Sequence, residues 1–167
     1  DLDRCFSVSR LKVNDKELVL ANSHMSAYDK GGKIRALQMQ AMKAFFEEEI
    51  SKGNYVIVGG DFNHDLVNSY ERGLFKSEQQ LPEWLQILNN DDLTSGFSII
   101  ADDTSPSCRD ADIPYEQGVV FTSVVDGFIV SNNIDVKSVN NIVNLNGDDI
   151  NFMYSDHNAS VLKFCLK

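Results

Sequence analysis

The feature that most constrains this chain is the segment Tyr55–Asp65, which reads Tyr-Val-Ile-Val-Gly-Gly-Asp-Phe-Asn-His-Asp. Its apolar run, Val56–Val58, predicts a short strand that is covered on both faces. Asp61 and Asn63 follow two positions apart, so an extended backbone points both side chains to the same side. A carboxylate and an amide at the end of a buried strand are costly unless something uses them. A metal or phosphate site and a turn capped by its own side chains both explain this pattern.

Length and charge narrow the class of protein. A chain of 167 residues corresponds to about one domain, and 15 basic against 25 acidic residues give a formal charge of −10. This charge argues against a broad surface that tracks the phosphates of long nucleic acids, but it permits a small site that recruits cations. No apolar stretch is long enough to span a bilayer.

The three cysteines are far apart and form neither a disulfide framework nor a metal-ligand spacing. Cys5 and Cys165 lie in apolar, strand-like contexts and are expected to be core thiols. This cysteine usage favours a reducing, cytoplasmic location, while a signal or anchor upstream stays open. The chain runs from Asp1–Arg4 directly into a strand-like segment without an initiator Met, so we interpret it as part of a longer protein.

The first half predicts a hairpin and a helix. Arg4–Lys12 and Glu17–Ser23 are expected strands, and they deliver His24 to a strand end as a ligand, a phosphate contact or a histidine satisfied by the backbone. A helix is expected over Lys33–Ser51, ended by Lys52 and Gly53. The expected inward face consists of Ile34, Leu37, Ala41, Phe45 and Ile50, and the expected solvated face of Arg35, Lys43 and Glu47–Glu49.

The middle of the chain predicts mostly loops. Leu66–Pro82 is polar and irregular and is expected to lie over the site. Pro82–Asn90 predicts a short helix that turns Trp84 inward for packing rather than as a platform for a base. Asp91–Gln117 is expected to be a solvated, loop-rich insertion.

The last third adds further polar positions to apolar segments. Val119–Ser131 predicts two strands, and Asp126 within it needs a partner because it is a carboxylate in a buried strand. Asp135–Val143 predicts another strand, and the polar bend Tyr154–Asn158, with Asp156 and His157, leads into the terminal strand Ser160–Leu166. Polar groups at several strand ends of one domain indicate a single convergent pocket.

Four short pieces carry a family resemblance. In order they are Ser23-His24-Met25, Gly60-Asp61-Phe62-Asn63, Asp126 in an apolar strand and Ser155-Asp156-His157. Together they resemble the endonuclease/exonuclease/phosphatase superfamily, which includes deoxyribonuclease-like enzymes, abasic-site nucleases, neutral sphingomyelinases and inositol-polyphosphate 5-phosphatases. The resemblance covers nearly the whole chain but only the later half or more of a family domain. It implies an α/β (α+β) fold, a four-layered sandwich of two mainly antiparallel sheets flanked by helices, with residues 1–167 as a single partial domain.

The resemblance also implies a metal-dependent phosphoester hydrolase in which water attacks phosphorus, with Mg²⁺, or Mn²⁺ or Ca²⁺, as the cation. Asp61 and Asn63 would line the metal and phosphate pocket and position the water. His157 would accept its proton or stabilise the phosphoryl charge, and Asp126 would orient His157. The remaining implied roles are a carboxylate near the cation for Asp156 and contact with phosphate or the leaving oxygen for His24.

One departure limits these expectations. Family members carry an Asn and a metal-binding Glu in their N-terminal half, and nothing in Asp1–Lys16 substitutes for them. We therefore expect the parent protein to be active and this chain alone to be inactive, with an apolar sheet face that needs the missing segment or a second copy. The substrate is expected to be a small-molecule, lipid-headgroup or nucleic-acid phosphate ester, and mixed charges over Leu66–Leu81 favour the first two. The alternatives are a nuclease acting on DNA or RNA and a non-catalytic phosphate- or protein-binding module.

Overall fold

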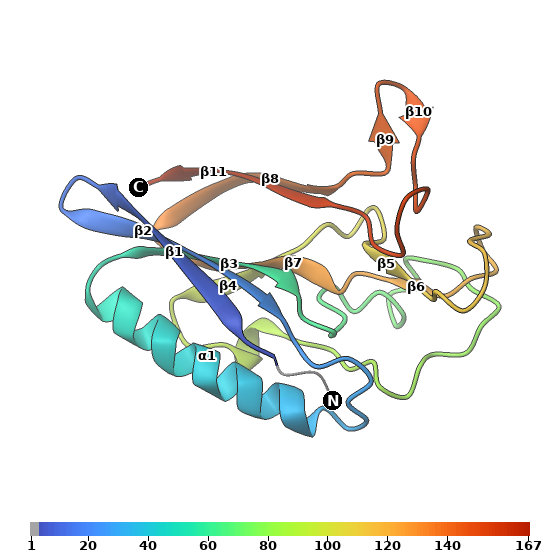
Figure 1. Cartoon of the computed structure of the whole chain (residues 1–167), viewed down its shortest axis with the longest axis horizontal. Helices are drawn as coiled ribbons and strands as arrows, with labels where there is room; N and C mark the ends of the chain where they lie inside the picture. Colours follow the sequence, from blue (N-terminus) through green and yellow to red (C-terminus); the bar gives the residue numbers. More distant parts are fainter. Residues whose placement is uncertain (1–3) are drawn as a thin grey trace.

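The computed structural model describes residues 4–167, and Asp1–Asp3 lie outside the described residues. Its centre is a five-stranded sheet with the order β1–β2–β3–β7–β4 (Figure 1). These strands are β1 (Phe6–Val13), β2 (Lys16–His24), β3 (Tyr55–Asp61), β7 (Asp126–Ser131) and β4 (Phe97–Ile100). Only β2 and β3 pair in parallel, so the sheet is mainly antiparallel, as predicted.

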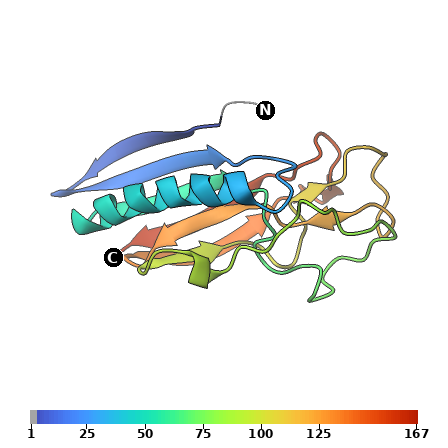
Figure 2. The same cartoon turned by 90° about the horizontal axis from the view of Figure 1, so that it is seen from below.

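The central sheet is covered on both faces. The helix α1 (Lys33–Ser51) connects β2 to β3 and lies along one face (Figures 1 and 2), where Met42 and Phe46 pack against Val56 and Val58. The antiparallel pair β8 (Ile134–Asn141) and β11 (Ser160–Leu166) lies over the other face. The predicted α+β sandwich is therefore confirmed, with one helical layer rather than two within residues 4–167.

The remaining elements are short. They are the 3₁₀ helix η1 (Asn90–Asp92) and the two-residue strands β5 (Cys108–Arg109), β6 (Thr122–Ser123), β9 (Asn144–Leu145) and β10 (Asp148–Asp149). β5 pairs with β6, and β9 with β10 in a hairpin that projects from the body (Figure 1). Over the part of the chain that the structure describes, no helix has the length and apolar character needed to cross a membrane.

The predicted helix has the right bounds but the wrong inward face. Ile34 and Leu37 are 42% and 67% exposed, whereas Arg35 and Glu49, expected in solvent, are 0% and 1% exposed. The inward stripe is Arg35, Met39, Met42, Phe46 and Glu49, which also repeats at helical spacing. The two charges are buried because each has polar partners: Arg35 donates to backbone carbonyls, and Glu49 accepts hydrogen bonds from Arg10, Lys52 and Asn54.

Three further expectations are wrong. Pro82–Asn90 is a turn and extended segment rather than a helix, with Leu85 N–H donating to the Pro82 carbonyl. Phe97–Ile100, expected in a solvated insertion, is an edge strand hydrogen-bonded to β7. Cys5 and Cys165 are exposed rather than core thiols. For Cys165 the reason is the strand period of two, which places it on the outward side of β11.

The parallel pairing of β2 and β3 depends on Gly60. Its φ is 148°, and a Cβ at this position would lie 1.8 Å from the Ser23 carbonyl oxygen. Only glycine allows the two backbones to approach this closely. The resulting register sets His24 opposite Asp61 at the carboxyl ends of the two strands.

Candidate active site

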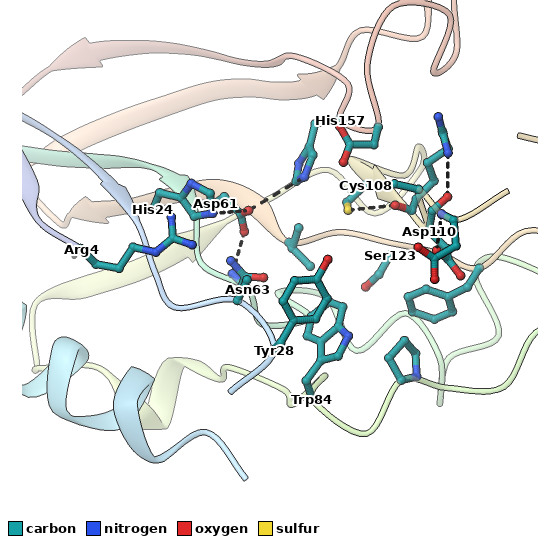
Figure 3. Close-up of a pocket in the computed structure, with 18 residues that line it drawn as sticks. Arg4, His24, Tyr28, Asp61, Asn63, Trp84, Cys108, Asp110, Ser123 and His157 are labelled. Carbon is teal, nitrogen blue, oxygen red and sulfur yellow. Dashed lines mark hydrogen bonds and ion pairs between the residues drawn. The ribbon is translucent and has the colours of Figure 1, made fainter. Parts of the chain in front are cut away.

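All of the predicted polar positions except Asp126 line one pocket of about 650 Å³ (Figure 3), and Asp126 joins them through its contact with His157. His157 Nδ1 lies 2.7 Å from Asp126 Oδ2, and its Nε2 lies 3.9 Å from Asp61 Oδ2. His24 Nε2 approaches the same Asp61 oxygen at 3.3 Å. Asn63 also lines the pocket. The sequence therefore correctly predicted that these separated segments converge.

Asp61 and Asn63 are held by a tight turn directly after β3. Asn63 N–H donates to Asp61 Oδ1 at 2.8 Å, and the Asn63 amide nitrogen donates to the Met25 carbonyl at 3.0 Å. Asn63 has a φ of 49°, in the left-handed region that asparagine tolerates better than most residues. Both explanations offered for this segment therefore hold. Oδ1 of Asp61 closes the turn, while Oδ2 faces His24 and His157 in the pocket.

The Asp126–His157 pair is fixed from behind by Ser107, which is fully buried. Its hydroxyl oxygen accepts hydrogen bonds from Val125 N–H at 3.0 Å and Asp126 N–H at 2.9 Å, and its carbonyl accepts one from Asn158 N–H at 2.8 Å. These bonds tie the start of β7 to the bend that carries His157. Ser107 was missed from the sequence because it lies in a segment expected to be solvated, and only long-range contacts reveal it.

Burial and neighbouring charges set the protonation states. Burial, and then repulsion from Asp126, raise the pKa of Asp61 above its ordinary value. The hydrogen bond that His157 donates to Asp126, followed by the contact with the Cys108 side chain, raises the pKa of His157 to about 11. His157 is therefore an imidazolium at neutral pH, and its charge offsets the two nearby carboxylates.

The donor set fits a divalent cation. Ligand atoms of Asp61, Asp126 and His157 all lie within 4.8 Å of one another. Carboxylate oxygens are the ligands that Mg²⁺ and Ca²⁺ prefer, and Asp61 and Asp126 supply two of them at close range. Of the predicted metal ligands, Asp61 belongs to this cluster. Asp156 and Asn63 line the pocket, and their roles as ligands stay predictions.

The opposite wall of the pocket carries aromatic side chains that the sequence reasoning did not assign to it. Tyr28 and Trp84 line the pocket with an edge-to-face contact, and Phe121 is also part of the lining. Trp84, expected to pack in the interior, is only half-buried. Of the loop expected to cover the site, Leu66–Pro82, only Pro82 reaches the pocket.

Neither a protein-family model nor a curated protein matches the sequence. Solved structures do match its fold. D. rerio TDP2 complexed with single strand DNA product is 14% identical with a TM-score of 0.62, over 97% of this chain and 62% of that one. The mannosyl-6-phosphatase of Bacteroides thetaiotaomicron is 18% identical with a TM-score of 0.55, over 98% and 57%. An endonuclease/exonuclease/phosphatase from Bacteroides vulgatus is 16% identical with a TM-score of 0.60, over 98% and 56%.

These likenesses establish the fold. The chain spans 62% or less of the length of these three structures.

Proposed function

We propose that this chain, which has the fold of the endonuclease/exonuclease/phosphatase superfamily, carries the catalytic centre of a divalent-cation-dependent phosphoester hydrolase. The observation that carries this proposal is the His157–Asp126 pair facing Asp61 across one pocket. A partly buried carboxylate that orients an imidazole beside a second carboxylate is costly to assemble, and phosphoester hydrolysis uses each of these groups.

The carboxylates Asp61 and Asp126 would hold the cation, with Asn63 and Asp156 at the rim of the same pocket. When bound, a hard divalent cation neutralises the negative charge that develops on the phosphoryl group. Only Oδ1 of Asp61 accepts the hydrogen bond of its turn, so Oδ2 would be available to orient a water molecule for attack on phosphorus.

His157 acts on the phosphoryl group through its Nε2 atom. Its Nδ1–H donates to Asp126, which fixes the ring and leaves Nε2 directed toward Asp61. Of the two predicted roles, the raised pKa favours stabilisation of phosphoryl charge by the imidazolium over removal of a proton from water. His24, whose Nε2 lies 3.3 Å from the same Asp61 oxygen and whose side chain is 54% exposed, would contact phosphate or the leaving oxygen.

The charges around the pocket favour small phosphoesters. Its lining contains four aspartates, Asp61, Asp110, Asp112 and Asp156, but only two arginines, Arg4 and Arg109. A polynucleotide backbone would bring several negative charges to this acidic rim. A nuclease is the second candidate, favoured by the DNA product in the D. rerio TDP2 structure.

We further propose that residues 1–167 form the later part of a larger catalytic domain. Val136, Leu162, Phe164 and Leu166, which pack between β8–β11 and the central sheet, are only partly buried. Together with the partial coverage of the matched structures, this supports a further segment of the parent protein, or a second copy, as the missing cover. The chain alone is then expected to hydrolyse phosphoesters weakly or not at all.

The test compares the parent protein with the 167-residue chain in Mg²⁺ on plasmid DNA, sphingomyelin and inositol phosphates. We expect turnover of at least one ester by the parent, lowered about 10²–10⁴-fold by His157→Ala. Lys163→Ala, which changes an exposed side chain on β11, should leave the rate unchanged. Hydrolysis that survives His157→Ala unaltered would contradict the catalytic assignment and favour a non-catalytic binding module.

A further inference from the structure

Two aromatic side chains from separate loops meet at the mouth of the pocket. Tyr28 lies in the loop after β2, and Trp84 lies in the turn after Pro82. Their ring centroids are 6.1 Å apart and their planes are inclined by 79°. Figure 3 shows both rings across the pocket from Cys108 and His157. A substrate whose phosphate lies beside His157 would thus present its remaining part to these rings.

A buried guanidinium holds the two loops together. Arg35 is 0% exposed, and it donates through Nη2 to the Trp84 carbonyl at 2.6 Å and through Nη1 to the Ser26 carbonyl at 3.3 Å. On the surface, Lys30 and Glu83 form an ion pair of 2.5 Å between the same two loops. Burying an arginine without a hydrogen-bonded carboxylate is costly, and here it fixes the loops that carry the two rings.

Tyr28 has an unfavourable backbone conformation and an exposed side chain. Its φ is 54°, a left-handed conformation that is uncommon for a bulky residue, and its side chain is 81% exposed. Backbone strain of this kind persists where the surroundings impose it, and it clusters at ligand sites. The Tyr28 ring adds little to the stability of the fold, because most of its surface is exposed and its aromatic contact is with Trp84.

We propose that Tyr28 and Trp84 form a specificity-determining subsite that binds the ring of a phosphoester substrate. The ring is a nucleobase, whose flat face stacks on aromatic side chains, or a sugar, whose puckered ring lays its apolar C–H groups against them. The placement of the phosphate beside Asp61 and His157 rests on the proposed function. The acidic lining restricts the substrate to a single phosphorylated unit rather than a strand with many phosphates.

Trp84 is the single tryptophan of the chain, so its fluorescence reports on this subsite directly. We would titrate the 167-residue chain in Mg²⁺ with adenosine 5′-monophosphate, glucose 6-phosphate and inorganic phosphate. The ring-bearing phosphates should change the Trp84 emission saturably and bind more tightly than inorganic phosphate. The tighter of the two identifies the ring as base or sugar.

Variants of Tyr28 isolate the stacking contact. Tyr28→Asn keeps the left-handed backbone accessible while removing the ring, and it should weaken binding of the preferred ligand roughly tenfold. Tyr28→Phe should restore binding. Tyr70→Asn, at a 61% exposed tyrosine outside the pocket lining, is the matched control and should change nothing.

Equal affinity for all three probes, or binding that ignores Tyr28→Asn, would overturn the subsite. The failure of the proposed function has a different signature. If the parent hydrolyses no ester while this chain binds a ring-bearing phosphate through Tyr28, the subsite stands and the hydrolase assignment falls. If the parent hydrolyses ring-bearing esters with a KM that Tyr28→Asn leaves unaltered, the hydrolase stands and the subsite falls.

Discussion

At the scale of single residues, the charge on His157 depends on one hydrogen bond. Asp126 Oδ2 lies 2.7 Å from Nδ1 of the ring, and this contact is the main reason for the raised pKa of His157. A histidine in water would be mostly neutral at pH 7.5. The positive charge on His157 at this pH therefore requires the folded site, and it should be lost when Asp126 is removed.

We predict that Asp126→Asn returns the pKa of His157 from about 11 toward its usual value near 6.5. An NMR titration of the imidazole resonances measures this directly. Because the folded pKa is raised, the pair stabilises the fold fully below about pH 6.5, and this advantage over Asp126→Asn is lost as the pH rises toward about 11. A wild-type His157 that titrates near pH 6.5 would contradict the prediction.

At the scale of elements, Glu49 links α1 to the edge strand β1. Glu49 is 1% exposed, and Arg10 donates to its two oxygens at 2.7 and 2.9 Å. Lys52 and Asn54 donate to the same carboxylate at 3.1 and 2.8 Å. The hydrogen bond from Arg10 is the main reason that the pKa of Glu49 falls to about 2.

Glu49→Gln should therefore destabilise the chain by roughly 1–3 kcal/mol at pH 7, because it removes the charge of a buried carboxylate that accepts several hydrogen bonds from half-exposed cations and Asn54. Since the folded pKa of Glu49 is lowered, its contribution is present above about pH 4.5 and is lost as the pH falls toward about 2. Urea unfolding from pH 7 to pH 2 should show the free energies of unfolding of the wild type and Glu49→Gln converging in acid.

The control Glu48→Gln removes an exposed pair with Lys52 and should cost under about 1 kcal/mol at any pH. Equal effects of the two substitutions would refute a special role for Glu49.

For helix α1, the sequence predicted the bounds correctly but not the face that is buried. Local pattern and capping residues located Lys33–Ser51 correctly, because these signals lie within the segment itself. The inward face was wrong because hydrophobicity assigns charged residues to solvent. The burial of Glu49 depends on Arg10, 39 positions away, and that of Arg35 on the Trp84 carbonyl, 49 positions away. Such partners are not visible in a local pattern.

The site was predicted unevenly for the same reason. Polar residues at strand ends or in apolar segments stood out: His24, Asp61, Asn63, Asp126 and His157. Four of them line one pocket, and Asp126 contacts His157 beside it. Ser107, Tyr28 and Trp84 carry no such signal. Their positions follow from long-range packing around β7 and Arg35. The strand β4 was missed similarly, because it is defined by pairing with β7.

At the scale of the whole molecule, the chain is acidic, and its candidate site brings two carboxylates close together. The chain carries a formal charge of −10, and folding brings the carboxylates of Asp61 and Asp126 close together. Burial and the repulsion between these carboxylates raise the pKa of Asp61, so the ionised Asp61 destabilises the folded state. A cation that binds only the folded state relieves this repulsion.

We predict that Mg²⁺ raises the melting temperature of the 167-residue chain, and that Asp61→Asn raises it without Mg²⁺ but abolishes the response. A concentration 100 times the dissociation constant would add about 2.7 kcal/mol. Asp112→Asn, at the rim but outside the cluster, is the control and should keep the response to Mg²⁺. A melting temperature that rises equally with Mg²⁺ in wild type and Asp61→Asn would locate the cation elsewhere.

The register of β2 on β3 sets His24 against Asp61, with Gly60 as the residue that permits the close approach. A single codon gained or lost within 55–61 would bring a neighbour of Asp61 opposite His24 and turn the carboxylate away from both imidazoles. Length changes at the tip of the β9–β10 hairpin, between Leu145 and Asp148, disturb no such alignment. Related chains should therefore vary in length at that hairpin and keep a constant spacing between Val56 and Asn63.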